Sequence, residues 1–493
     1  MINPYLVIFI LLAYFALLIF IARITSKKAG NDAFFLGNRK SPWYVVSFGM
    51  IGASLSGVTF ISIPGWVNTA QFSYMQMVLG YMFGYWVIAT VLLPLYYRLK
   101  LTSIYSYLGQ RFGPSTYKTG ASFFLLSRII GASFRLFLVA IVLQIAVFEP
   151  LGMTISFVPS VIVTVALIWL YTNRGGIKTI IWTDTLQTIF MLLAVLITIK
   201  SIMSAMDMNW LGLIKTIKGS EYSQIFVFDD FATNPRNFFK MFLGGAFIAI
   251  TMTGLDQDMM QKNLSIKTLY ESQKNVFWLG VMLIFVNLIF LSLGALLYLY
   301  AAQINFPIPE QTDYLYPQLA IGGYFGVFAG IAFVIGLTAS AYSSADSALT
   351  SLTTSFSIDI LNVEEKPEKE RVKIRKRVHI GMSLVLIIVI ILFKVINNDN
   401  VVQSLFDAAK YTYGPLLGFY FAGLFTKLQV KDKFMPLVAI LAPILSYAFN
   451  WYAAEFLDYN IGFELIIFNG FLTVMGMWII SKKDEVPSQT ETV

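Results

Sequence analysis

The segment spanning residues 336–360 has the length of a membrane span but the composition of a binding site. Its sequence, GLTASAYSSADSALTSLTTSFSIDI, carries a polar residue at almost every second position. Hydroxyls and a carboxylate are costly in hydrocarbon unless they line a wet cavity or hold an ion, so the segment predicts a functional site. Close helix packing is the alternative, because small and hydroxyl residues also serve there. On a helix, one face would carry Ser340, Ser343, Ser344, Asp346, Ser347, Thr350, Ser351, Thr354 and Ser357.

The composition is that of a polytopic membrane protein. Of the 493 residues, 57% are hydrophobic and 13% are charged, and the mean hydropathy is +0.71. The chain has no cysteine and one histidine, His379, which excludes disulfides, thiolate metal centres and triads built on cysteine or histidine. His379 adjoins the basic run KIRKRV, so we expect a solvated residue at a loop end. Only intramembrane sites remain, and we do not expect an enzyme.

Apolar spans of about bilayer-crossing length recur along the whole chain, which predicts an all-α fold. The first is too long for a signal-peptide core and lacks a convincing cleavage site, so we expect it to be retained. The thirteen spans lie at roughly 3–22, 43–68, 73–97, 119–148, 153–171, 180–203, 238–262, 274–301, 323–360, 377–396, 402–426, 434–452 and 462–481.

The basic residues indicate orientation in the membrane and not nucleic-acid binding, although the net charge is +8. They occupy alternate short loops, including one that holds Lys262 and Lys267, whereas the loop at 302–322 has none. Because positively charged loops stay in the cytoplasm, we expect the N-terminus outside and the C-terminus inside. The absence of cysteine and the compact termini favour a bacterial inner membrane.

Two predicted spans, at 43–68 and 238–262, contain glycine-rich interruptions, which weaken a helix. Interrupted spans at corresponding positions of two halves indicate a transporter built from inverted repeats, with its site at the breaks. Unwound backbone would supply carbonyl oxygens for a cation and helix N-termini for an anion. Packing through small residues is the alternative. The interruptions comprise Gly49, Gly52 and Gly57 in the first span, and Gly244, Gly245, Gly254, Asp256, Gln257 and Asp258 in the second.

Several charged residues also fall within predicted spans. Asp184 lies about one turn inside a span, where it is either an interfacial carboxylate or, with hydroxyl and carbonyl oxygens, a ligand for a hard cation. Arg128 and Arg135 share a helix face because they are seven positions apart. An arginine at membrane depth needs a partner, which Asp256 or a solute carboxylate would supply. Structural ion pairing and solute binding therefore both remain open for the two arginines.

Three motifs resemble the sodium:solute symporter family, whose members carry sugars, sialic acid, proline, vitamins or iodide together with sodium. The first is S-L-S-G-V-T-F-I-S-I-P-G from Ser54, and the second is G-G-I-x-x-I-I-W-T-D-x-x-Q from Gly175 to Gln187. The third begins S-A-Y-S-S-A-D-S-A-L-T-S at Ser340 and ends S-I-D-I at Ile360. With the number of spans, the resemblance covers almost the whole chain.

The resemblance implies the leucine-transporter type of fold, in which two inverted repeats of five helices each begin with a broken helix. Repeat one would occupy residues 43–203 and repeat two residues 236–427. Residues 1–28 would form an additional N-terminal transmembrane helix, and residues 434–481 two additional C-terminal ones. Residues 482–493 would form a short cytoplasmic tail.

Sodium sites are implied by the same resemblance. The first would use backbone carbonyls of Gly52 and Leu55, the carbonyl of Ser340 and the hydroxyls of Ser343 and Ser344. Members similar to the sialic acid transporters hold a second sodium, which here would fall between Asp184, Ser343 and Ser347. Asp346 stands where those members carry a serine. This extra carboxylate is compatible with a tighter second sodium, with a proton or with an arginine partner.

The implied function is sodium-coupled symport, by alternating access, of a small polar solute such as a sugar, an amino sugar or a sialic-acid-like acid. Proton coupling, or an amino acid or carboxylate as the solute, are the alternatives. Expected partners are the solute, sodium ions and the lipid bilayer, with no nucleic acid and with the monomer as the working unit. Three other classes of protein, a channel, a sensor and a membrane enzyme, agree less well with the sequence than a symporter does. The paired breaks argue against a channel, and the missing cysteines argue against an enzyme. The implied solute-binding residues are Ser56, Thr59, Gln76, Arg135, Asp256 and Gln257.

Overall fold

The computed structural model describes residues 4–26, 30–144, 148, 157–396 and 401–481. Within these ranges the chain is helical and forms no strand, apart from isolated bridges between Ser41 and Ile266 and between Val430 and Ser481. The predicted tail at 482–493 lies outside the described residues. The prediction of an all-α chain is therefore confirmed for the part that the structure describes.

Eight described helices are long and apolar enough to cross a membrane, or ten spans if each of two bent helix pairs counts as one. The shorter helices α9 (Phe157–Gly175), α18 (Val401–Thr412), α19 (Gly414–Phe425) and α21 (Leu465–Ile479) lie where the sequence predicts three further spans. The long helices are α1 (Pro4–Thr25), α5 (Tyr74–Val87) continuing through a π-helical turn into α6 (Leu93–Arg98), α8 (Pro114–Leu143), α10 (Ile177–Ala205), α14 (Leu269–Gln303), α16 (Val327–Ser355), α17 (Glu368–Ile396) and α20 (Met435–Phe456).

The first bent pair consists of α3 (Trp43–Ser54) and α4 (Gly57–Ala70), which meet at an angle of 55°. Leu55 has φ −96° and ψ 77°, and Ser56 has φ −68° and ψ 174°, so the backbone is extended at the break. The last carbonyls of α3 therefore lack intrahelical donors. The predicted first interruption thus forms a real break inside the molecule.

The second bent pair joins α12 (Phe238–Ala249), with a π-helical turn at Ile250–Gly254, to α13 (Gln257–Leu264) at 64°. Asp256 caps α13, because its carboxylate accepts hydrogen bonds from the backbone N–H groups of Asp258 and Met259. A carboxylate is favourable at the N-terminus of a helix, because free backbone N–H groups and the positive end of the helix dipole stabilise its charge. The second interruption is therefore also a break, with a buried aspartate at its centre.

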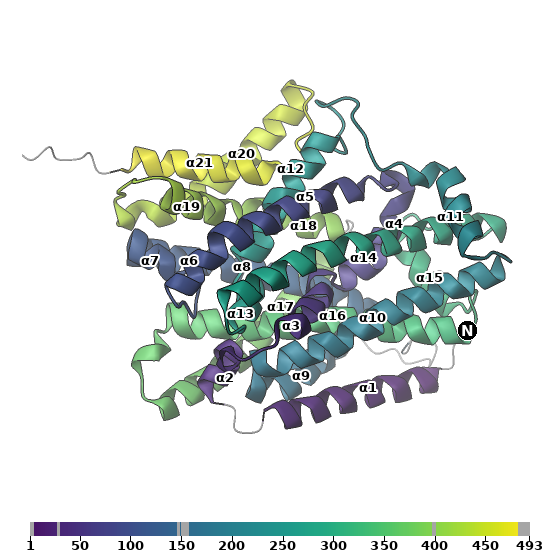
Figure 1. Cartoon of the computed structure of the whole chain (residues 1–493), viewed down its shortest axis with the longest axis horizontal. Coiled ribbons are helices and arrows are strands. Elements are labelled where there is room, and N and C mark those ends of the chain that lie inside the picture. The colour runs from purple at the N-terminus through teal and green to yellow at the C-terminus, as the bar shows by residue number, and fades with distance from the viewer. Residues whose placement is uncertain (1–3, 27–29, 145–147, 149–156, 397–400, 482–493) are drawn as a thin grey trace, which may run out of the picture.

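The hydroxyl-bearing helix α16 runs through the centre of the molecule and packs along α10, α8 and the first broken pair (Figure 1). Small residues allow the close approach: a Cβ atom added at Gly57 would lie 2.9 Å from Ala341 Cβ. Ser340, Ser343, Ser344, Asp346 and Ser347 are all buried on this helix. The predicted polar face therefore points into protein and not into lipid.

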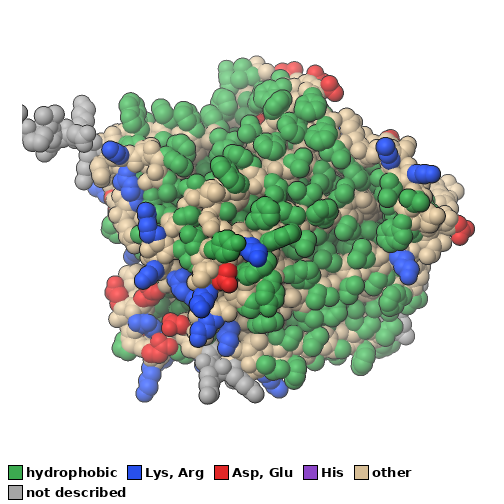
Figure 2. Space-filling model, viewed as in Figure 1, with side chains coloured by type: hydrophobic (Ala, Val, Ile, Leu, Met, Phe, Trp, Pro, Cys, Tyr) green, Lys and Arg blue, Asp and Glu red, His purple; other side chains and the backbone are tan. Residues whose placement is uncertain are grey.

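The two ends of the bundle differ in charge. In Figure 1, the N-terminal end of α1 lies with α11 (Trp210–Gly219) and α15 (Leu315–Ile321) on the right, opposite α2 (Asn31–Leu36), α6 and α7 (Ser106–Arg111) on the left. Figure 2 shows hydrophobic side chains over the middle of this face, with more Lys and Arg at the left end than at the right. An apolar band between charged ends is the surface expected of a membrane-embedded bundle.

The structure contradicts the predicted surroundings of His379. The side chain is 2% exposed, and its ring lies between Thr172 and Thr353, with Nε2 3.0 Å from Thr172 Oγ1 and Nδ1 2.8 Å from Thr353 Oγ1. The prediction of a solvated loop end was wrong because α17 begins at Glu368 and carries the basic run and His379 as one continuous helix.

Candidate functional site

Oxygen atoms from the first break and from α16 converge at one buried point. Ser344 Oγ lies 3.5 Å from the carbonyl of Ala53 and 3.4 Å from that of Ser340. The nearby carbonyls at the end of α3 have no intrahelical donors. Carbonyl and hydroxyl oxygens in such a cluster suit a hard cation. The residues predicted for the first sodium site, Gly52, Leu55, Ser340, Ser343 and Ser344, therefore come from segments that meet here.

Gly52 allows α3 to approach α10 and α16 closely at this point. Its N–H donates to Thr188 Oγ1 at 3.1 Å, and the Thr188 hydroxyl donates to the carbonyl of Asp184 at 2.8 Å. A Cβ atom at Gly52 would collide with Thr188 Oγ1 and lie 3.5 Å from Ser343 Oγ. Sequence reasoning missed Thr188, although its position one turn after Asp184 on α10 was a usable signal.

Asp184, Asp346 and Ser347, three of the residues named for a second sodium site, have separate partners. Asp184 Oδ1 accepts from Ser343 Oγ at 2.7 Å, and Asp346 Oδ2 accepts from Tyr171 at 2.9 Å. The hydroxyl of Ser347 donates to Asp258. Asp184 is 1% exposed, so it is not an interfacial carboxylate.

Lys262 is an unforeseen member of this region. Its Nζ lies 2.7 Å from Asp184 Oδ2, and the lysine side chain is 1% exposed. We expected Lys262 in a cytoplasmic loop, and this was wrong because α13 folds inward behind the second break and buries the lysine. A lysine in a short polar segment looks like a topology determinant by sequence alone.

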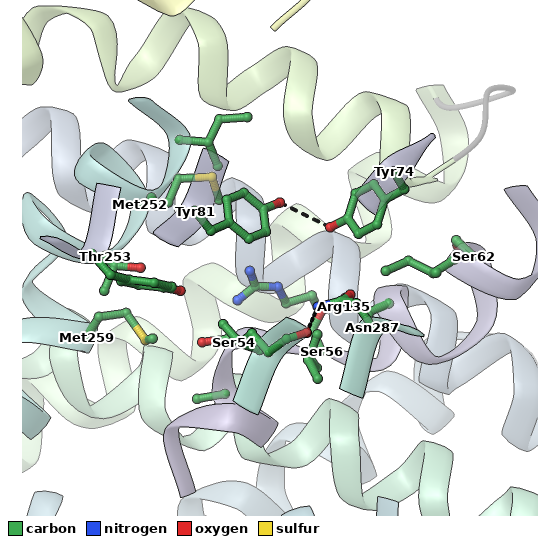
Figure 3. A pocket seen from close by; sticks show the side chains of 18 of the residues that line it. Ser54, Ser56, Ser62, Tyr74, Tyr81, Arg135, Met252, Thr253, Met259 and Asn287 are labelled. Carbon is green, nitrogen blue, oxygen red and sulfur yellow. Dashed lines mark hydrogen bonds between the residues drawn. The ribbon is translucent and has the colours of Figure 1, made fainter. Parts of the chain in front are cut away.

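A cavity of about 100 Å³ lies between the two broken helices. It is lined from α3 and α4, from α5, α8 and α14, and from the second break. Figure 3 shows the guanidinium of Arg135 inside it, between the ring of Tyr81 and the side chains of Ser54 and Ser56. Tyr74 and Tyr81 share a 3.1 Å hydrogen bond across the opposite wall. The cavity thus offers the guanidinium groups of Arg128 and Arg135, several hydroxyls and aromatic faces to a solute.

The two arginines of α8 have different surroundings. Arg128 makes an ion pair with Asp258 and lies 3.7 Å from Asp256. Arg135 is 6% exposed, and its Nε and Nη1 atoms have no hydrogen-bond partner among the described residues. Arg128 therefore pairs with the second break, although its Nε also lacks a hydrogen-bond partner among the described residues. Arg135 has no carboxylate partner among those residues and presents its donors to the cavity.

The predicted solute-binding residues separate into two groups. Ser56, Thr59 and Arg135 line the cavity. Gln76 instead bonds the backbone of Val227 and Arg236, and Gln257 bonds that of Thr102 and Ile104, so both amides hold loops. Asp256 accepts a 2.5 Å hydrogen bond from Tyr413 beside its cap bonds. Sequence reasoning missed the lining residues Ser54, Trp66, Tyr74, Tyr81 and Asn287, since no pattern separates them from packing residues.

The model of the sodium:solute symporter family matches residues 34–427, which include both breaks and α16. This chain belongs to the sodium:solute symporter family. The predicted membership is thus confirmed, and with it sodium as the coupling ion of the family. The members of this family are transporters, which agrees with the expectation that the chain is not an enzyme.

Among the relatives of this family member is the sodium/sialic acid symporter NanT of Aliivibrio fischeri, 24% identical over 91% of this chain and 88% of NanT. SiaT of Proteus mirabilis, also a sodium/sialic acid symporter, is 22% identical over 85% of this chain and 84% of its own. Human sodium-coupled monocarboxylate transporter 2 is 25% identical over 55% of this chain and 43% of its own.

Solved structures agree on the fold of this symporter. A substrate-bound, outward-open Na⁺-coupled sialic acid symporter aligns with a TM-score of 0.81 at 20% identity, covering 97% of this chain and 98% of that one. The nucleobase-cation-symport-1 family transporter Mhp1 aligns with a TM-score of 0.57 at 13% identity, covering 89% and 92%. Both are transporters of the leucine-transporter fold.

Proposed function

We propose that this chain imports a small carboxylate-bearing solute of the sialic acid class together with sodium. The observation that carries the proposal is Arg135, a buried guanidinium with unmatched donors inside the cavity between the two broken helices. Charge-assisted hydrogen bonds from arginine to a carboxylate are strong and directional. The likeness to sialic acid symporters over most of the chain supports this class of solute.

The hydroxyls around Arg135 suit the polar groups of an amino sugar. Ser54 and Ser56 lie beside the guanidinium at the first break, and Asn287 lies on α14 nearby (Figure 3). Thr59 of α4 also lines the cavity. Trp66 and Tyr81 supply aromatic faces, on which a sugar ring packs. A few convergent polar groups in an otherwise apolar cavity are typical of small-molecule sites.

Sodium and solute would act through the same helix. A sodium ion held by the α3 carbonyls and by Ser343 and Ser344 ties α16 to the first break, and Ser56, which faces the solute, sits in that break. The ion must bind the two access states differently in order to bias them, and we place the preference on the outward-open state. One sodium entering an interior about 100 mV negative releases roughly 2.3 kcal/mol from voltage alone.

Topology belongs to the same proposal. Thirteen spans would form two inverted repeats at 43–203 and 236–427, with one helix before and two after them. The basic end of the bundle would face the cytoplasm of a bacterium, which leaves the N-terminus outside and the C-terminus inside. The working unit would be the monomer, since the cavity and the first sodium site are built within one chain.

A small monocarboxylate is the second candidate solute. A cavity of about 100 Å³ is smaller than the engineered cavity of about 150 Å³ that holds benzene in another protein, and several relatives are sodium-coupled monocarboxylate transporters. Both candidates use the same arginine, so they differ in the size of the solute and not in its charge.

Ligand-dependent thermal stability of the purified protein separates these solutes, because a ligand that binds only the folded state raises Tm with its concentration. We expect N-acetylneuraminate to raise Tm in sodium but not in equimolar potassium, and neutral N-acetylmannosamine to have no effect. A shift with lactate or pyruvate alone would favour the second candidate. A shift with N-acetylmannosamine equal to that with the acid would contradict the role of Arg135.

A further inference from the structure

Lys262 brings an ammonium group to the buried carboxylate of Asp184. Its Nζ lies 2.7 Å from Asp184 Oδ2, and both side chains are 1% exposed. The other oxygen of Asp184 accepts from Ser343 Oγ at 2.7 Å. Asp346, on the next turn of α16, keeps one oxygen on Tyr171 and has an Oδ1 atom without a hydrogen-bond partner among the described residues. Lys262 is therefore a cation held in a site built from α10, α13 and α16.

This is the position at which the sequence suggested a second sodium. The residues present do not fit that ion, because both oxygens of Asp184 are already taken, one by a hydroxyl and one by an ammonium. Ser347, the third suggested ligand, turns its hydroxyl to Asp258 instead. A sodium ion here would have to displace a positive charge that is covalently attached to the chain.

We propose that the ammonium of Lys262 permanently takes the place of a second sodium, so that each transport cycle uses a single sodium ion. This inference rests on the proposed function and adds the ion stoichiometry to it. An attached ammonium neutralises the carboxylate of Asp184 in every access state, but it cannot leave with the solute. It therefore supplies charge balance without adding to the driving force.

The local charge agrees with one sodium. With both carboxylates ionised, Asp184, Asp346 and Lys262 together carry a net charge of −1. The first sodium site shares Ser343 with this cluster, and a sodium ion there would balance the remainder. Ser343 can serve both, because a hydroxyl has one donor for Asp184 and keeps lone pairs for the ion.

Removing the ammonium of Lys262 should allow a sodium ion to bind in its place. In a Lys262→Met variant, the carboxylates of Asp184 and Asp346 would remain buried without a counter-charge, which is strongly unfavourable. Sodium, supplied by the solvent and bound by the freed Asp184 oxygen beside the Ser343 hydroxyl, would relieve this. We therefore expect the variant to gain a binding site for sodium.

The experiment is equilibrium binding of radioactive sodium to the purified full-length protein without solute. Wild type should bind one sodium per chain with a Hill coefficient near one, and Lys262→Met should bind two with a coefficient rising toward two. Lys262→Arg should stay at one. Lys240→Met is the matched control: this lysine is also buried, but its Nζ bonds the carbonyls of Ala232 and Asn460 away from the site, so binding should stay at one.

The double variant Lys262→Met/Asp184→Asn covers the case in which the single variant does not fold, because it removes both charges of the pair. It should bind one sodium, as wild type does. Two sodium ions on wild type would overturn the inference. A folded Lys262→Met variant that still binds one sodium would overturn it as well. No sodium on wild type would instead contradict the proposed function.

Discussion

Arg128 and Arg135 lie on the same face of α8 and border the same cavity, but their partners differ. Arg128 pairs with Asp258 and approaches Asp256, whereas Nε and Nη1 of Arg135 have no hydrogen-bond partner among the described residues. The spacing of the two arginines predicted their shared face and left both roles open. Their surroundings assign one to the second break and make the other the candidate solute anchor.

Replacing Arg135 with methionine should remove most of the affinity for an acidic solute. A hydrogen bond to a charged group contributes about 1.5–3 kcal/mol, so KM should rise roughly 10- to 100-fold. Sodium binding should change little, because the first sodium site is assigned to α3, the first break and α16, and not to α8. Uptake kinetics and sodium binding on the same preparation check this, and an unchanged KM would exclude Arg135 as the anchor.

Replacing Arg128 with methionine should act on folding. It leaves Asp256 and Asp258 buried at the second break, and loss of one partner of a buried ion pair costs about 3–5 kcal/mol. Thermal unfolding in detergent should show a large fall in Tm, partly restored in Arg128→Met/Asp258→Asn. If the single variant were as stable as wild type and only KM changed, Arg128 would be a solute ligand.

The double variant Ser343→Ala/Ser344→Ala should abolish sodium-stimulated uptake. Both hydroxyls lie at the meeting point of α16 with the first break, and no aliphatic side chain supplies an oxygen in their place. Solute uptake measured against sodium concentration should become flat. As a control, Ser292→Ala removes an exposed hydroxyl that bonds only its own helix on α14, and it should leave the sodium dependence unchanged.

Substituting Gly52 with alanine tests the close approach of α3 and α10. The new Cβ would collide with Thr188 Oγ1, and overpacking of this kind costs about 1–3 kcal/mol. We expect a lower Tm and weaker sodium binding, with part of both restored in Gly52→Ala/Thr188→Ala. Gly381→Ala on α17 is the control, since nothing lies within 4 Å of the added atom.

Features that are local in sequence could be predicted. The glycine density around Gly52 and the polar run from Ser340 identified the first break and the helix facing it, because backbone weakness and helical periodicity depend on neighbouring residues. The fold class followed from the same patterns. The structure places these segments against one another, as the resemblance implied.

Partners distant in sequence could not be predicted in this way. Lys262 carries the signature of a loop residue, and only the turn at Asp256 brings its ammonium to Asp184. The prediction for His379 failed for a similar reason. Its basic neighbours in the sequence suggested solvent exposure, whereas its ring lies between two threonines that are distant in sequence or one helix away. Gln76 and Gln257 have the polarity expected of solute ligands, but their amides bond loop backbone.

The most direct test of sodium-coupled import is accumulation of labelled N-acetylneuraminate in proteoliposomes. Vesicles with an inward sodium gradient should concentrate the acid above the outside level, and equimolar potassium should give only equilibration. Wild type and Ser343→Ala/Ser344→Ala should be compared side by side, and the variant should fail to accumulate in sodium. Equal accumulation in potassium, lost when a pH gradient is collapsed, would contradict sodium coupling and indicate a proton symporter.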